Sequence, residues 1–178
     1  MNKKVLIILG SPRKGGNSEI LCEQFALGAK ESGHEVEKVS LQDEQLGYCK
    51  ACYYCREHKE CIQKDGMNGI LSKMFEADVI VLATPMYYYT MSGQMKTFID
   101  RSLPRYREIT NKDVYLIATG AVSEESKFEI IFDEFVAYIN CLKGSKEKGR
   151  IYGKGVYLPG EVNDTKAMKD AFEMGNKI

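Results

Sequence analysis

The chain of 178 residues lacks several features that would place a protein in a class at once. It has no apolar run near the ~20 residues that a membrane-spanning helix needs, and its first residues lead directly into a strand pattern. We therefore expect a cytoplasmic protein with no membrane contact. It also has no net charge, with 25 basic and 25 acidic residues, which argues against a nucleic-acid binder that relies on a basic surface.

Residue patterns typical of hydrolase active sites do not stand out either. The two histidines, His34 and His58, have no partner pattern, and we expect His58 to be solvated. No Ser-His-Asp set and no pair of carboxylates at acid–base spacing stands out. No linker, internal repeat or low-complexity segment interrupts the chain, and 44% of its residues are hydrophobic. We therefore expect a single domain over residues 1–178 with a substantial core.

Apolar, β-rich segments alternate with helical patterns along the whole chain. This alternation predicts an α/β fold with a parallel, doubly wound sheet and right-handed crossovers. The expected strands are Val5–Leu9, Glu35–Leu41, Asp78–Thr84, Asp113–Thr119 and Ile151–Leu158, and the expected helices are Ser18–Gly33, Met67–Glu76, Ser92–Arg101, Ser126–Leu142 and Asp164–Gly175. Ligands of such sheets bind outside the carboxyl ends of the strands. The candidate loops are therefore 10–17, 42–66, 85–91 and 120–125.

The loop after the first expected strand has the composition of a phosphate site. Glycines allow close approach of the backbone, and the amides and dipole of the following helix favour negative charge. Ser11, Asn17 and Ser18 can add neutral donors, and Arg13 can add its charge. The lysine of a Walker A loop and the G-x-G-x-x-G fingerprint are both absent. The alternative is an ordinary glycine- and serine-rich turn.

The segment 42–66 is too long for an ordinary loop and carries four cysteines: Cys49, Cys52, Cys55 and Cys61. Their C-x2-C-x2-C-x5-C spacing is close to that of cysteines that hold an iron–sulfur cluster, although no proline follows and x5 replaces x3. Reduced thiols or a redox disulfide are a second interpretation, and zinc is a third. We expect Cys22 and Cys141, in predicted helices, to be small core residues.

Three consecutive tyrosines, at positions 87–89, follow the third expected strand. Adjacent side chains cannot share one buried face, so this pattern suits a loop that lays aromatic and backbone groups along a flat ligand. A tyrosine-rich surface turn is the alternative. Ser92 or Thr90 could cap the next helix.

Together, Gly10–Ser18, Thr84–Tyr88 and Met95–Arg101 make the chain resemble the flavodoxin-like, NAD(P)H-dependent FMN reductase superfamily. With its four loop cysteines, the chain resembles the iron–sulfur flavoprotein branch. The resemblance spans residues 4 to about 175, and its motifs are specific as a set. It implies a five-stranded sheet of order 2-1-3-4-5 with helices on both faces, and a homodimer or homotetramer.

The resemblance also implies site residues. Ser11, Arg13, Asn17 and Ser18 would hold the FMN phosphate, and the flavin ring and ribityl chain would be lined by Pro85, Met86, Tyr87, Tyr88, Thr119 and Gly120. Cys49, Cys52, Cys55 and Cys61 would hold a [4Fe-4S] cluster. Structural or subunit-interface roles are implied for Lys96, Asp100 and Arg101.

Three functions follow from this resemblance. The first is an FMN-dependent oxidoreductase that passes electrons from a ferredoxin-like donor through the cluster to FMN and on to a small acceptor. The second is an NAD(P)H-dependent FMN or quinone reductase without a cluster. The third is not an enzyme but a flavodoxin-like electron carrier or a redox sensor, and the zero net charge counts against the carrier because such carriers are typically acidic.

Overall fold

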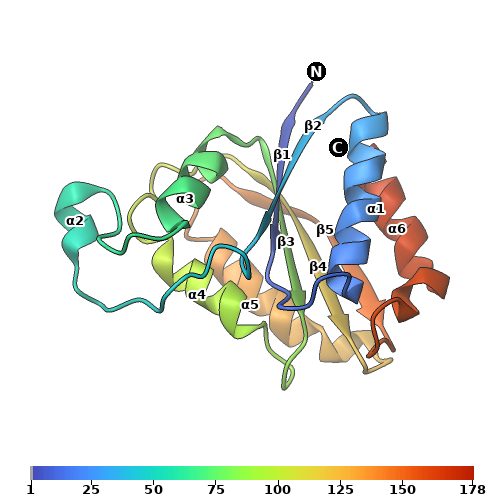
Figure 1. The fold of residues 1–178 in the computed structure, drawn as a ribbon. Helices are drawn as coiled ribbons and strands as arrows, with labels where there is room; N and C mark the ends of the chain where they lie inside the picture. Colours follow the sequence, from blue (N-terminus) through green and yellow to red (C-terminus); the bar gives the residue numbers. More distant parts are fainter. Residues whose placement is uncertain (1) are drawn as a thin grey trace.

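A five-stranded, all-parallel sheet of order β2-β1-β3-β4-β5 forms the centre of the protein, of which a computed structural model describes residues 2–178 (Figure 1). The strands are β1 (Lys4–Leu9), β2 (Glu35–Ser40), β3 (Val79–Pro85), β4 (Asp113–Gly120) and β5 (Lys146–Lys154). The strand order and the parallel pairing confirm the predicted flavodoxin-like sheet. Each candidate loop follows the end of a strand: 10–17 follows β1, 42–66 begins two residues after β2, 85–91 starts at the last residue of β3 and 120–125 at the last residue of β4.

Helices cover both faces of the sheet, as expected (Figure 1). They are α1 (Asn17–Glu31), α2 (Tyr54–His58), α3 (Met67–Glu76), α4 (Gly93–Arg101), α5 (Glu129–Ile139) and α6 (Lys166–Asn176). Successive side chains of a strand point to opposite faces, so β1 contributes to two cores. Val5, Ile7 and Leu9 pack beneath α1 and α6. Leu6 and Ile8 pack beneath α3, α4 and α5.

Helices α1 and α6 lie side by side on one face, with glycine at the points of closest approach (Figure 1). A Cβ atom at Gly28 would lie 2.1 Å from the carbonyl oxygen of Phe172. A Cβ atom at Gly175 would lie 2.1 Å from the carbonyl oxygen of Phe25. The two backbones are therefore closer than any side chain would allow, and this contact fixes α1, whose first turn faces the site.

The expected last strand was placed too late in the sequence. Strand β5 covers Lys146–Lys154 instead of residues 151–158, and the chain leaves the sheet at Gly155, whose φ is +69°. The first part of β5 lies at the sheet edge and is mostly polar, so it lacks the apolar run that marks a buried strand. Helix α5 is also shorter than the expected 126–142, because a 3₁₀ turn precedes it.

The cysteine-bearing segment stands apart from the layered core. Figure 1 shows the part that carries α2 extending sideways beyond α3 and α4, away from α1 and α6. No helix among residues 2–178 is long and apolar enough to cross a membrane.

Candidate functional site

The loop after β1 is shaped by close contact with α4. Gly10 donates its N–H to Ala83 O at 2.8 Å, and its carbonyl accepts a hydrogen bond from Ser92 Oγ at 2.7 Å. A Cβ atom at Gly10 would lie 2.9 Å from that of Met95, so the loop needs glycine there. Ser92 also accepts from the N–H of Met95 and is the predicted cap of α4.

Helix α1 begins without a side-chain cap. Its N-cap residue, Gly16, has an extended backbone and no side chain that could accept from the first helix amides. The amides of the first turn, at Asn17 and Ser18, are therefore left for another partner. Gly15, with φ at +66°, supplies the left-handed turn before the helix. This open helix start is the arrangement that binds anionic groups in many proteins.

Two of the predicted phosphate residues hold the loop's own shape. Ser11 Oγ accepts from the N–H of Arg13 at 3.2 Å, and Arg13 Nη1 donates to Tyr157 O at 3.0 Å. Ser18 Oγ lies 2.7 Å from Thr119 Oγ1 in a buried contact that joins α1 to the end of β4. The first turn of α1 and the end of β4 thus meet at one edge of the sheet.

Asn17 is occupied by contacts that its position in sequence does not reveal. Its Nδ2 donates to Leu158 O at 2.9 Å, and its Oδ1 accepts from the N–H groups of Gly160 (3.0 Å) and Val162 (3.3 Å). The side chain is 8% exposed. Asn17 therefore anchors the segment after β5 against the start of α1.

The loops after β3 and β4 meet each other. Met86 donates its N–H to Thr119 O at 2.7 Å, and a Cβ atom at Gly120 would lie 3.1 Å from that of Met86. A cavity of about 170 Å³ lies between these loops and the start of α1. Every predicted flavin-site residue except Tyr88 lines it, together with Gly16, Ala121, Val156 and Tyr157.

Tyr88 and its neighbour form the tip of a two-residue hairpin. Tyr87 and Thr90 exchange both backbone hydrogen bonds at 3.0 Å, and Tyr88 and Tyr89 have φ of 50° and 67°. Turns with two positive φ values normally use Asn or Gly, because bulky residues are strained there. Tyr88 is 98% exposed and does not line the cavity, so the structure does not place it with the other residues.

Val156 and Tyr157 are cavity residues that sequence analysis missed. They lie in the segment after β5, which was expected to be strand through residue 158. Two signals mark this segment as a loop: Gly155, with a positive φ, and the Pro159-Gly160 pair.

All four loop cysteines are free. Burial raises the pKa of Cys55, and the charges of Cys61, Cys52 and Cys49 raise it further, in that order. The backbone of the segment adopts the left-handed conformation, with positive φ, at Ala51, Tyr53 and Lys59, and it turns at each of these residues. No three His, Cys, Asp or Glu side chains in residues 2–178 are grouped so as to hold one metal ion. The thiols are therefore not gathered around a single point among the described residues.

The other two cysteines differ from each other. Cys22 is fully buried in α1 and burial raises its pKa, as expected of a core residue. Cys141 was expected in the core but is exposed, because α5 ends at Ile139 and the chain turns there. His58 is exposed as predicted, stacked on Tyr54 with ring centres 3.7 Å apart.

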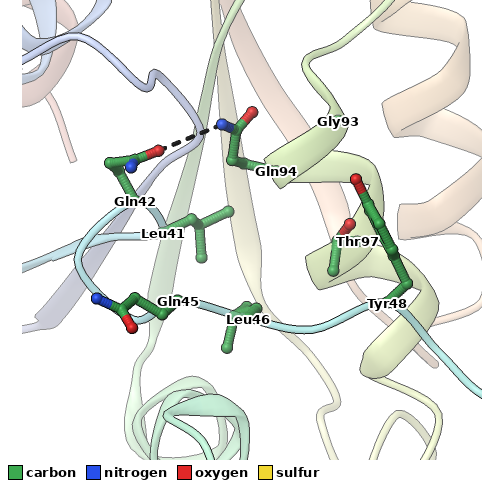
Figure 2. A pocket seen from close by; sticks show the side chains of 8 residues that line it. All are labelled: Leu41, Gln42, Gln45, Leu46, Tyr48, Gly93, Gln94 and Thr97. Carbon is green, nitrogen blue, oxygen red and sulfur yellow. Dashed lines mark hydrogen bonds between the residues drawn. The ribbon is translucent and has the colours of Figure 1, made fainter.

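A second cavity, of about 260 Å³, separates the start of the cysteine segment from α4 (Figure 2). The polar side chains that line it are uncharged. Gln94 Nε2 donates a hydrogen bond to Gln42 Oε1 at 3.3 Å. Figure 2 shows this pair, with Gln45, Tyr48 and Thr97 around the same space. The cysteine segment therefore contacts α4 near the beginning of that helix.

Comparisons with known proteins agree with this geometry. Residues 3–128 match the family described as NADPH-dependent FMN reductase. An iron-sulfur flavoprotein of Archaeoglobus fulgidus is 37% identical over 181 residues, covering 98% of this chain and 78% of the relative. Another, of Methanosarcina thermophila, is 40% identical and covers 98% and 93%. The solved structure of an azoreductase from Bacillus anthracis matches with a TM-score of 0.78 at 18% identity over the whole of both chains, which shows the fold alone.

Proposed function

The chain belongs to the NADPH-dependent FMN reductase family, and from that premise we propose that it is an FMN-dependent oxidoreductase whose cysteine segment holds a [4Fe-4S] cluster. The observation that carries the proposal is the cavity where three loops meet the uncapped start of α1. The four free cysteines of the cysteine segment supply the proposed ligands of the cluster.

The start of α1 fits the phosphate of FMN. The free amides of Asn17 and Ser18 and the helix dipole favour a doubly charged anion. Arg13 is exposed and already bound to Tyr157 O through Nη1, so its remaining guanidinium donors are free to add charge-assisted hydrogen bonds. Ser11 and Ser18 add hydroxyl groups at the cavity wall.

The remaining cavity residues fit the flat part of the flavin. FMN supplies the redox chemistry when bound, accepting a hydride or single electrons. Met86 and Tyr87 offer backbone and apolar surface to the ring. Gly120 lets the loop after β4 pack directly against Met86, because a Cβ atom there would lie 3.1 Å from that of Met86. Their work is to orient the ring and to keep water from part of it. Tyr88 would contribute only if the hairpin tip bends toward the bound ring.

The cysteines supply the ligand number of a cubane cluster. Such a cluster takes four thiolates, one on each of its four irons. The segment provides four free cysteines, at C-x2-C-x2-C-x5-C spacing. The exposed side chains of Cys49 and Cys52 leave this segment open to an approaching protein.

The electron path that we propose runs from a ferredoxin-like donor to a small acceptor such as a quinone, oxygen or a peroxide. NAD(P)H is the alternative donor if the cysteines hold no cluster. We also propose a homodimer or homotetramer. Large apolar side chains are exposed at Tyr53 in the cysteine segment, at Tyr88 in the hairpin and at Leu103 after α4, and they are consistent with a subunit contact.

The test uses two cysteine variants purified without oxygen. Cys52→Ala should lose iron and sulfide while keeping the fold and FMN, because it removes one thiolate of the proposed set. Cys141→Ala is the matched control, since its thiol is exposed far along the chain, and it should keep all of its iron. Full iron retention in Cys52→Ala would contradict the cluster assignment. Arg13→Ala should weaken FMN binding about tenfold or more, the effect of one lost charged hydrogen bond of ~1.5–3 kcal/mol; an unchanged affinity would contradict the phosphate placement.

A further inference from the structure

Arg101, at the end of α4, has no exposed side-chain surface. A buried arginine is rare unless it is paired. Its guanidinium donates two parallel hydrogen bonds to the carboxylate of Asp65, from Nη1 to Oδ2 at 2.6 Å and from Nη2 to Oδ1 at 2.9 Å. Arginine is not deprotonated in proteins, so the side chain is a fixed positive charge inside the protein.

The same guanidinium reaches both ends of the cysteine segment. Nη1 donates to Gly47 O at 2.8 Å, just before the first cysteine. Nη2 donates to Cys61 Sγ at 3.1 Å, at the last one. Asp65 in turn accepts the N–H groups of Gly47 and Met67, each at 3.2 Å. One residue of α4 therefore ties the two ends of the segment together.

Cys61 is held more firmly than the other three cysteines. Its N–H donates to Asn68 Oδ1 at 2.9 Å, and its carbonyl accepts from Asn68 Nδ2 at 3.1 Å. Among the described loop cysteines, only the Cys61 thiol accepts a side-chain hydrogen bond. Arg101 Nε, in the same guanidinium, is buried without an acceptor among residues 2–178. A buried, unpaired donor next to a thiol fits a site that receives an additional acceptor.

We propose that Arg101 is a positioning residue for the cluster: it fixes Cys61 as a ligand, and its N–H···S bond raises the cluster's reduction potential. The inference rests on the proposed cluster. Reduction adds one electron to the cluster and its thiolates, so a hydrogen bond and a buried positive charge stabilise the reduced form more than the oxidised form. The guanidinium stays protonated throughout, and no proton is transferred.

Two variants shift the potential in opposite directions if the proposal holds. Arg101→Lys keeps a positive charge but replaces the planar fork with a single ammonium, which cannot serve Asp65 and Cys61 together. We expect the reduction potential of the cluster in this variant to fall by about 59 mV, which corresponds to a tenfold change in the one-electron equilibrium. Asp65→Asn leaves the charge of Arg101 uncompensated beside Cys61, and we expect its potential to rise.

The measurement is a redox titration of the oxygen-free holoprotein, followed by electron paramagnetic resonance, with iron, sulfide and FMN assayed on each sample. Arg150→Lys is the matched control. Arg150 on β5 also pairs with carboxylates, Glu147 and Glu129, but touches no cysteine. Its potential should equal that of the unaltered protein.

The possible results distinguish a failure of the role proposed for Arg101 from a failure of the proposed cluster itself. An unaltered protein with FMN but no iron overturns the cluster and this inference with it. Iron-loaded protein in which Arg101→Lys leaves the potential unchanged overturns only the role of Arg101. Potentials that move in the same direction in both variants also overturn it, because a loosened segment would do that. If Arg101→Lys does not fold, Asp65→Asn decides: an unchanged or lowered potential refutes the proposal.

Discussion

Replacing Asn17 with alanine tests how the start of α1 is built. The change removes three hydrogen bonds to the segment after β5, one to Leu158 O and two from the N–H groups of Gly160 and Val162. Val162 is fully buried, so its N–H would lose its partner away from water, at a cost of about 1–3 kcal/mol. The Gly160 amide is half-buried and water can replace part of its bond. We expect unfolding to become easier by about 2–4 kcal/mol.

FMN binding should weaken in the same variant, because Val156 and Tyr157 line the cavity and belong to the segment that Asn17 anchors. Urea unfolding of the FMN-free protein measures the first effect, and quenching of FMN fluorescence measures the second. Asn163→Ala is the control, since Asn163 lies in the same segment with an exposed side chain. The reasoning is refuted if Asn17→Ala unfolds within about 0.5 kcal/mol of the unaltered protein, the ordinary range of surface substitutions.

Three further predictions concern stability, each measured by urea unfolding. Gly28→Ala should destabilise by about 1–3 kcal/mol, because its Cβ would lie 2.1 Å from Phe172 O and force α1 and α6 apart; a neutral effect would contradict the close crossing. Tyr88→Gly should stabilise by about 0.5–1 kcal/mol by relieving a φ of 50°, and a loss of stability would show that the exposed ring packs on something. Cys22→Ser should cost about 1–3 kcal/mol by burying a hydroxyl, whereas Cys141→Ser should be neutral; equal effects would contradict their different burial.

Much of the fold could be predicted from local patterns. Strands β1, β3 and β4 are buried apolar runs, and α3 begins and ends at the predicted residues. The edge strand β5 could not be placed, because four of its first five residues are charged and none of these five is buried. Its position depends on pairing with β4 across a register shift at Val114 and Tyr115, which is a tertiary property.

The predicted flavin-site residues come from three short stretches of sequence, and the structure brings all of them except Tyr88 to one cavity. Their role toward FMN stays a prediction. The role of Asn17 toward residues 158–162 could not be predicted, because the bonds join positions more than 140 residues apart. The burial of Arg101 could not be predicted from the sequence either, because a charged residue in the last turn of an amphipathic helix usually faces water.

The central claim is that FMN and a [4Fe-4S] cluster occupy the same chain. The most direct test is an absorption spectrum of protein purified without oxygen, with FMN, iron and sulfide assayed on the same sample. We predict one FMN per chain, flavin bands over a broad shoulder near ~400 nm, and about four irons with matching sulfide. Flavin bands with no iron or sulfide would contradict the cluster and favour direct reduction by NAD(P)H.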